Sequence, residues 1–306
     1  MLVVVAPGQG SQQPAMLNHW IDNPRNKNLF EKYGAISNLD LIYFGTKASK
    51  DEIKNTQITQ PLLSALSLVS FLNLNIQNKD SIIFAGHSVG EFSASVFSDF
   101  MNEEQAIKLV SLRGKFMNEA ASESEQTGMA AILGGDKEKV INELENYDLF
   151  SANINSQGQI IASGKMSNID KLISKPIEKT KVIKLDVSGA FHTPYMQKAK
   201  DRFISVIEKE SFENSKNKLL SNYDGELVTN ANDLKLKLSN QLTNSVRWDL
   251  CQETMLKLGA TGLMEVAPGG VLSGIAKKAI PQIEIMTIKT PDDIENANAF
   301  IMKHNK

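Results

Sequence analysis

A glycine–serine motif that directly follows an apolar run constrains the fold more than any other part of the chain. The apolar run covers residues 82–85, and the motif, residues 86–90, reads Gly-His-Ser-Val-Gly. A strand, a sharp turn and a helix in this order form a nucleophile elbow, which exposes a serine oxygen on a strained turn. The order therefore predicts a strand over 82–85, a helix from Glu91 and a nucleophile at Ser88. Because glycine and serine are also common in ordinary turns, the motif needs support from the rest of the chain.

Size, charge and cysteine content narrow the class of protein. The 306 residues are enough for one large α/β domain or two smaller ones. With 42% hydrophobic residues, 22% charged residues and a formal net charge of -2, the composition gives no support to binding of nucleic acid or of a membrane surface. The single cysteine, Cys251, excludes an intramolecular disulfide, and the N-terminus lacks the basic region of a signal peptide. We therefore expect a cytoplasmic protein.

Two other features have a competing chemical interpretation. Cys251 lies at apolar helical spacing beside Trp248, which favours a buried structural thiol over a nucleophile. The glycine-rich stretch 7–12 follows an apolar run at 2–6, as a phosphate-binding loop does. It lacks both the Gly-Lys-Ser/Thr ending and the three-glycine spacing of nucleotide-binding motifs, so we expect no nucleotide site there.

The pattern of strands and helices changes after a polar, helix-breaking stretch at 121–128. Before it, apolar periodicity predicts helices at 60–74, opened by Pro61, and at 101–121. After it, a compact alternation predicts strands at 129–133, 149–154, 159–162 and 181–187 and helices at 137–146 and 168–175. This βαββαβ order is the ferredoxin-like unit.

The segments on both sides of this unit predict a larger α/β body with a mainly parallel sheet covered by helices. In its C-terminal part we expect helices at 194–209 and 248–258, strands around 219–221 and 263–267, and a final α/β pair. The predicted larger subdomain is formed by residues 1–123 and 190–306, and residues 124–189 form the small inserted subdomain.

A serine nucleophile needs a neighbouring base, and elimination among the four histidines favours one of them. His304 lies in a polar C-terminal tail, and His19 lies in a polar stretch before a proline. His87 is next to Ser88, and neighbours on a tight turn point in different directions. His192 lies in a loop between a predicted strand and a predicted helix, where catalytic residues concentrate.

The order of these residues along the chain argues against an ordinary α/β-hydrolase, in which an acid and then the histidine come late after the serine. Here His192 lies in the middle of the chain. Asp186, the nearest preceding acid, falls in a predicted strand, where a solvated position is expected. A Ser-His dyad, with the imidazole oriented by a neutral group such as a backbone carbonyl, fits better.

A series of short motifs along the chain matches one known family in order. They are Gly8-Gln9-Gly10-Ser11-Gln12, Thr59-Gln60-Pro61, Gly86-His87-Ser88-Val89-Gly90-Glu91, Arg113-Gly114 with Met117, Asn153 with Asn155-Ser156, Gly189-Ala190-Phe191-His192, Gln241-Leu242-Thr243 with Val246-Arg247-Trp248, and Glu265-Val266 with Pro268-Gly269. Together they resemble the malonyl-CoA:acyl carrier protein transacylase family, whose superfamily includes the acyltransferase domains of fatty-acid and polyketide synthases. The resemblance implies an α/β-hydrolase-like larger subdomain beside the ferredoxin-like one.

The resemblance implies a ping-pong acyl transfer. Ser88 attacks the thioester carbonyl of malonyl-CoA while His192 takes its proton, and the phosphopantetheine thiol of acyl carrier protein then attacks the malonyl-Ser88 ester. The backbone N–H groups of Gln9 and Val89 form the oxyanion hole. Arg113 binds the free carboxylate of the malonyl group, because a guanidinium offers paired donors in carboxylate geometry.

The resemblance also implies roles for other pocket residues. The main-chain carbonyl of Gln241 orients the imidazole. Gln60 and Asn155 either line the pocket or support it, and Met117 and Phe191 either contact the acyl group or belong to the core. A bulky Phe191 ring fills the space of an α-methyl group, which favours malonyl over branched acyl groups.

The expected function is malonyl transfer from malonyl-CoA to acyl carrier protein for fatty-acid synthesis, by a monomer that needs no cofactor and no metal. Three alternatives stay open: a polyketide-synthase-associated acyltransferase of other acyl selectivity, a serine thioesterase or hydrolase, and a catalytically silent subunit that binds carrier protein. One position departs from the family pattern, since many relatives have lysine where this chain has Gly270. That change removes a positive contact for the phosphates of CoA or of the carrier.

Overall fold

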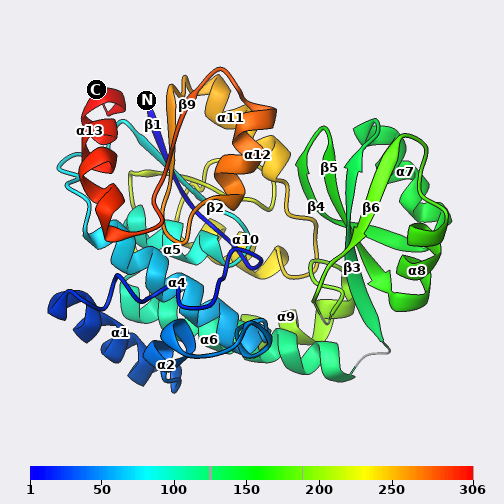
Figure 1. Ribbon diagram of the computed structural model, residues 1–306, viewed down its shortest axis with the longest axis horizontal. Helices are drawn as coiled ribbons and strands as arrows, with labels where there is room; N and C mark the ends of the chain where they lie inside the picture. Colours follow the sequence, from blue (N-terminus) through cyan, green and yellow to red (C-terminus); the bar gives the residue numbers. More distant parts are fainter. Residues whose placement is uncertain (124–125, 188, 306) are drawn as a thin grey trace.

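The computed structural model describes residues 1–123, 126–187 and 189–305 and contains two separate sheets (Figure 1). The larger sheet is parallel, with the strand order β7-β2-β1-β8-β9. Its strands are β1 (Leu2–Ala6), β2 (Ile82–Gly86), β7 (Lys218–Leu220), β8 (Gly262–Glu265) and β9 (Glu284–Thr287). The smaller sheet, drawn in green, is antiparallel. The predicted α/β class with a mainly parallel main sheet is confirmed.

The central strand β1 is buried on both faces, which explains its unbroken apolar sequence. Successive side chains of a strand point to opposite faces, so Leu2 and Val4 pack in one hydrophobic cluster while Val3 and Val5 pack in the other. The first cluster includes residues of α4 (Thr56–Leu72), α5 (Gly90–Phe97) and α6 (Glu103–Glu123). The second includes residues of α11 (Trp248–Lys257) and α12 (Val271–Ala279). Helices thus cover the parallel sheet on both sides.

The smaller sheet has the predicted βαββαβ connectivity and the strand order β4-β5-β3-β6. Its elements are β3 (Thr127–Gly134), α7 (Lys137–Asn146), β4 (Leu149–Ser156), β5 (Gln159–Lys165), α8 (Met166–Ser174) and β6 (Thr180–Lys184). One face of this sheet forms its own core with α7 and α8. The other face, which includes Ala131 and Ile161, joins the main core.

A short parallel bridge ties β4 to the larger part of the molecule. The N–H of Ile154 donates to the carbonyl of Val246 at 2.9 Å, and the N–H of Val246 donates to the carbonyl of Ala152 at 2.9 Å. The bridge holds the part of β4 that carries Asn153 and Asn155 against the larger subdomain. Its partner, Val246, lies far along the chain from β4.

The remaining helices complete the layers around the main sheet (Figure 1). They are α1 (Pro24–Ser37), α2 (Leu41–Thr46), α3 (Lys50–Ile53), α9 (Gln197–Ile207), α10 (Ala231–Asn240) and α13 (Ile294–His304), with short 3-10 turns at Pro194–Met196 and Pro291–Asp293. No helix among residues 1–123, 126–187 and 189–305 is long and apolar enough to cross a membrane. The predicted subdomain boundaries adjoin Ser124, Glu125 and Ser188, which lie outside the described residues.

Two sequence predictions about local structure were wrong. Helix α4 begins at Thr56 and not at Pro61, because the Asn55 side chain caps it by accepting from the N–H of Gln57. Pro61 therefore lies inside a helix that packing on the main core keeps intact. His304 is not in a frayed tail: it is a buried residue of α13, and its Nδ1 lies 2.9 Å from the Thr261 hydroxyl.

Candidate active site

Ser88 lies on a tight turn between β2 and α5, in a left-handed backbone conformation with φ 53°. Glycine is required on both sides of it. A Cβ on Gly90 would overlap the carbonyl of Ala6, and a Cβ on Gly86 would overlap the backbone of Gly90. The N–H of His87 donates to the Ala6 carbonyl at 3.0 Å, which fixes the turn against β1. This is the elbow geometry that the motif predicts, with the serine at the carboxyl end of a central strand.

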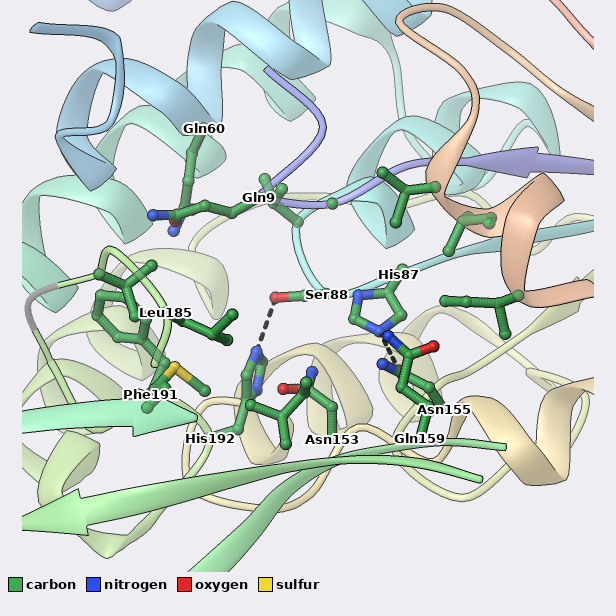
Figure 2. Close-up of a pocket in the computed structure, with 18 of the residues that line it drawn as sticks. Gln9, Gln60, His87, Ser88, Asn153, Asn155, Gln159, Leu185, Phe191 and His192 are labelled. Carbon is green, nitrogen blue, oxygen red and sulfur yellow. Dashed lines mark hydrogen bonds between the residues drawn. The ribbon is translucent and has the colours of Figure 1, made fainter. Parts of the chain in front are cut away.

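His192 also has a positive φ, 59°, and its ring bridges Ser88 and Gln241. Its Nε2 lies 2.8 Å from the Ser88 Oγ (Figure 2), and its Nδ1 lies 2.6 Å from the main-chain oxygen of Gln241. A carbonyl only accepts hydrogen bonds, so Nδ1 carries the proton and Nε2 is free to accept the proton of Ser88. The arrangement needs no acidic residue to set the tautomer.

Burial is the main reason that the pKa of His192 is lowered from 6.5 to about 3. The positive charge of Arg113 lowers it further, while the hydrogen bond to Gln241 opposes the shift. The imidazole is therefore neutral at pH 7, which is the state that accepts a proton.

The guanidinium of Arg113 is fully buried next to the nucleophile, and its hydrogen-bond acceptors among the described residues are neutral oxygens. One nitrogen donates to the Gln60 side-chain oxygen at 2.9 Å. The other donates to Ser88 Oγ at 3.2 Å and to Gln241 Oε1 at 3.0 Å. Burial lowers the pKa of Arg113 to about 9 and the charge of Glu91 opposes that shift, so the guanidinium stays charged at neutral pH. In the part of the chain that the structure describes, the paired donors of this cation thus meet no carboxylate.

Glu91, in the first turn of α5, is a fully buried carboxyl group that the sequence analysis did not assign to the site. Its Oε2 accepts hydrogen bonds from the backbone and side-chain N–H groups of Asn222 and, at 3.0 Å, from Gln241 Nε2. Burial raises the pKa of Glu91 to about 8. The available signal for a role of Glu91 in the site was its position: it is an acidic residue in the first turn of the helix that begins at the elbow.

A cavity of about 180 Å³ opens over Ser88 between the two sheets. Besides the dyad, six of the seven residues predicted to contact substrate line it, the exception being Arg113: Gln9, Gln60, Val89, Met117, Asn155 and Phe191. Arg113 and Gln241 do not line the cavity. Arg113 lies behind Gln60 and Ser88, which line it and accept hydrogen bonds from the guanidinium. The smaller sheet adds Asn153, which belongs to a family motif, and Met129, Gln159 and Ile161, which no sequence signal marked as pocket residues.

His87 points away from the Ser88 oxygen, as expected for its neighbour on a tight turn (Figure 2). Its Nε2 lies 2.9 Å from Asn155 Oδ1 on β4, and burial lowers the pKa of the ring. The main-chain carbonyl of Asn155 accepts a hydrogen bond from Gln252 Nε2 at 2.8 Å. The contact between His87 and Asn155 therefore joins the elbow to the smaller sheet.

Gln9 and Val89, the two expected oxyanion donors, both line the cavity. Val89 is the N-cap residue of α5, where the helix dipole favours negative charge. Neither backbone N–H donates a hydrogen bond to any group in the part of the chain that the structure describes. The Gln9 side chain is anchored by its hydrogen bond to Thr56 Oγ1 at 3.2 Å.

Other reactive groups lie apart from this chemistry. Cys251 is buried, its pKa is raised by that burial, and its thiol donates to the Ser221 carbonyl. Asp186 is solvated and pairs with Lys54 at 3.2 Å. Within the described ranges, no group of three or more His, Cys, Asp or Glu side chains is placed to hold a metal ion.

The chain is similar to known proteins in both sequence and fold. Residues 3–298 match the family model described as "Acyl transferase domain". The chain is 39% identical over 299 residues to the malonyl CoA-acyl carrier protein transacylase of Mycobacterium tuberculosis, covering 96% of this chain and 98% of the relative.

Solved structures show the same likeness. The crystal structure of MCAT from Mycobacterium tuberculosis superposes with a TM-score of 0.93 at 38% identity, covering 97% of this chain and 99% of the other. A malonyl-transacylase solved in complex with its type II PKS acyl-carrier protein gives a TM-score of 0.90 at 28% identity, covering 98% of this chain and 99% of the other.

Proposed function

This chain belongs to the acyl transferase domain family, and from that premise we propose that it transfers a malonyl group from malonyl-CoA to the phosphopantetheine thiol of acyl carrier protein. One observation carries the choice of acyl group. The buried guanidinium of Arg113 lies 3.2 Å from the Ser88 oxygen, and its partners there are neutral oxygens. A cation in that position suits an acyl chain that ends in a carboxylate.

In the first half-reaction, Ser88 Oγ bonds to the thioester carbon of malonyl-CoA while its proton passes to Nε2 of His192. The negative charge on the carbonyl oxygen is stabilised by the N–H groups of Gln9 and Val89, and one such donor is typically worth about 3 kcal/mol. The carbon–sulfur bond then breaks, and His192 returns the proton to the CoA thiolate. The product is a malonyl ester of Ser88.

The second half-reaction runs the same steps with the carrier. The phosphopantetheine thiol gives its proton to His192 as its sulfur attacks the ester carbon. The bond to Ser88 Oγ breaks, and the serine takes the proton back. The hydrogen bond from Nδ1 to the Gln241 carbonyl holds the imidazole in one orientation through both steps.

The malonyl carboxylate meets the guanidinium only by replacing a contact of Gln60 or of Ser88 with Arg113. Both are neutral acceptors, so the exchange replaces a neutral acceptor by an ionised one and adds the attraction between two opposite charges. The Gln60 amide also donates from Nε2 to the Met117 sulfur at 3.3 Å, and both side chains line the cavity. In this proposal, Gln60 and Met117 therefore form the end of the acyl pocket.

The proposal extends to cofactor, location and domain organisation. The dyad, the oxyanion donors and Arg113 supply every group that the two half-reactions need, so we propose no cofactor and no metal. The single cysteine is consistent with the cytoplasm. Residues 124–189 serve as the smaller subdomain, whose sheet closes the cavity from the side opposite Ser88.

Mass spectrometry of the intact protein tests the assignment. After incubation with equal amounts of malonyl-, methylmalonyl- and acetyl-CoA, we expect a malonyl adduct that moves to added carrier protein and is absent in Ser88→Ala. Release of free malonate as fast as carrier loading would instead indicate a hydrolase. A dominant methylmalonyl or acetyl adduct would indicate an acyltransferase of other selectivity, and no adduct at all would leave a silent carrier-binding subunit.

A further inference from the structure

The side-chain amide of Gln241 lies between Glu91 and Arg113. Its Nε2 donates to Glu91 Oε2 at 3.0 Å, and its Oε1 accepts from Arg113 at 3.0 Å. All three side chains are fully buried, so water does not compete for these contacts. A buried polar network of this kind is costly unless its members are paired in one arrangement.

The carboxyl group determines which way the amide faces. Three N–H groups converge on Glu91 Oε2, two from Asn222 and one from Gln241, so this oxygen is an acceptor. If the Gln241 amide rotated by half a turn, its NH₂ would face the guanidinium and its oxygen would face the Glu91 oxygen. Both contacts would then be repulsive. Glu91 thereby keeps the side-chain oxygen of Gln241 turned toward Arg113.

Asn222 holds the carboxyl group in place for this task. Its side-chain amide donates to Glu91 Oε2 and, at 2.7 Å, to the main-chain oxygen of Gly86 in the elbow. Gln241 in turn reaches the dyad through its own main-chain oxygen, 2.6 Å from His192 Nδ1. One residue therefore connects the carboxyl group to both the cation and the base.

The separation between Glu91 and Arg113 matters as much as the connection. A carboxylate in direct contact with Arg113 would take its paired donors in a two-bond fork and block an incoming carboxylate. With Gln241 in between, the donors of Arg113 remain on neutral oxygens that a substrate carboxylate replaces.

We propose that Glu91 is a positioning residue for recognition of the acyl carboxylate: it orients the Gln241 amide, and through it holds Arg113 ready for a dicarboxylic acyl group. This inference rests on the proposed malonyl transfer. It adds a residue that contacts neither the substrate nor the reacting atoms and acts through Gln241.

The test compares kcat/KM for malonyl-CoA with kcat/KM for acetyl-CoA. Glu91→Met removes the acceptor oxygen at similar length, and we expect the malonyl-to-acetyl ratio to fall about tenfold or more, as for one hydrogen bond to a charged group. Glu91→Gln keeps one acceptor oxygen and retains more of the ratio. Glu103→Met removes a carboxyl group that Tyr33 contacts far from the cavity, and it leaves the ratio unchanged.

A double-mutant cycle separates positioning from general damage. In an Arg113→Ala background, Glu91→Met has nothing left to orient, so the ratio should not change further. If Glu91→Met does not fold, Gln241→Leu breaks the same bridge from its other end while keeping the main-chain carbonyl, and the same fall in ratio is expected.

Three results would overturn the inference. They are an unchanged ratio in a folded Glu91→Met or Gln241→Leu variant, a Glu91→Gln variant as impaired as Glu91→Met, and an effect of Glu91→Met that persists without Arg113. Failure of the wild-type protein to form a malonyl-Ser88 adduct is a different outcome, because it rejects the proposed function itself.

Discussion

His192 Nε2 lies 2.8 Å from Ser88 Oγ, although 104 residues separate the two in the chain. Both residues have a positive φ, at 59° and 53°, in turns that follow strands or strand-like segments. Such backbone conformations persist only where the surrounding structure determines them. The dyad is therefore a product of two rigid turns brought together by the packing of helices on one sheet.

The elbow should be intolerant of any side chain at Gly90. In Gly90→Ala the new methyl group overlaps the Ala6 carbonyl, so we expect the free energy of unfolding to fall by about 1–3 kcal/mol or more. Urea unfolding measures this change. Gly158→Ala is the matched control, because its methyl group meets no atom within 4 Å. Equal stability of the two variants would contradict the tight approach of the turn to β1.

Removal of the buried cation should change acyl selectivity rather than abolish acyl transfer. In Arg113→Ala we expect kcat/KM for malonyl-CoA to fall about thirtyfold or more, with the acetyl-CoA value rising relative to it. Steady-state transfer to carrier protein with each thioester gives both numbers. Arg202→Ala, which removes an arginine of α9 that pairs with Glu119 at the surface, serves as the control. Undiminished malonyl transfer would reject the role of Arg113.

The dyad histidine should make the protein less stable in acid. The unfolded chain binds a proton at His192 below its ordinary pKa of 6.5, whereas the folded chain resists protonation until its pKa of about 3. The contribution of neutral His192 to the free energy of unfolding is thus fully present above pH 6.5. It is lost as the pH falls toward the folded-state pKa, by up to ~1.4 kcal/mol per pH unit.

Denaturant unfolding of wild type and His192→Gln between about pH 7 and pH 4 isolates this contribution, since other groups titrate in both proteins. We expect the smaller slope in His192→Gln. The exposed His19 provides a control, and His19→Gln should follow the wild-type curve. Parallel curves for wild type and His192→Gln would mean that His192 is not buried in its neutral form.

A smaller side chain at position 191 should relax the acyl pocket. Phe191 is buried and lines the cavity beside His192, so Phe191→Ala opens space next to the reacting carbon. We expect the preference for malonyl-CoA over methylmalonyl-CoA to fall about tenfold, the scale of one methyl group in a pocket. Competition between the two thioesters, read by the mass of the adduct, measures it. Phe150→Ala, at an exposed aromatic residue of β4, should leave the preference unchanged.

Sequence reasoning predicted most elements because their signals are local. The apolar run of β1 and the βαββαβ order of the smaller sheet were both confirmed. The start of α4 was placed at Pro61 because proline favours the first turn of a helix. The Asn55 side chain caps the helix several residues earlier, so α4 begins at Thr56. His304 was misjudged because only packing shows that the polar C-terminal segment closes on the sheet as α13.

The candidate site divides in the same way. Ser88 is marked by its motif, and His192 by elimination among the histidines. On the smaller sheet, Asn155 is marked by a family motif, whereas Gln159 and Ile161 carry no signal of their own because the sheet reaches the cavity only after it docks on the main core.

The local sequence is sufficient to specify the strained elbow, because glycines at 86 and 90 and an apolar strand before them leave that segment few other conformations. It also determined the α/β class, through periodicities that belong to single elements. How a base, a cation and a carboxyl group from distant segments meet follows instead from the packing of the whole chain. Gln241 lies between Glu91 and Arg113 and all three side chains are fully buried, and that ordering depends on burial and distance, which no local pattern encodes.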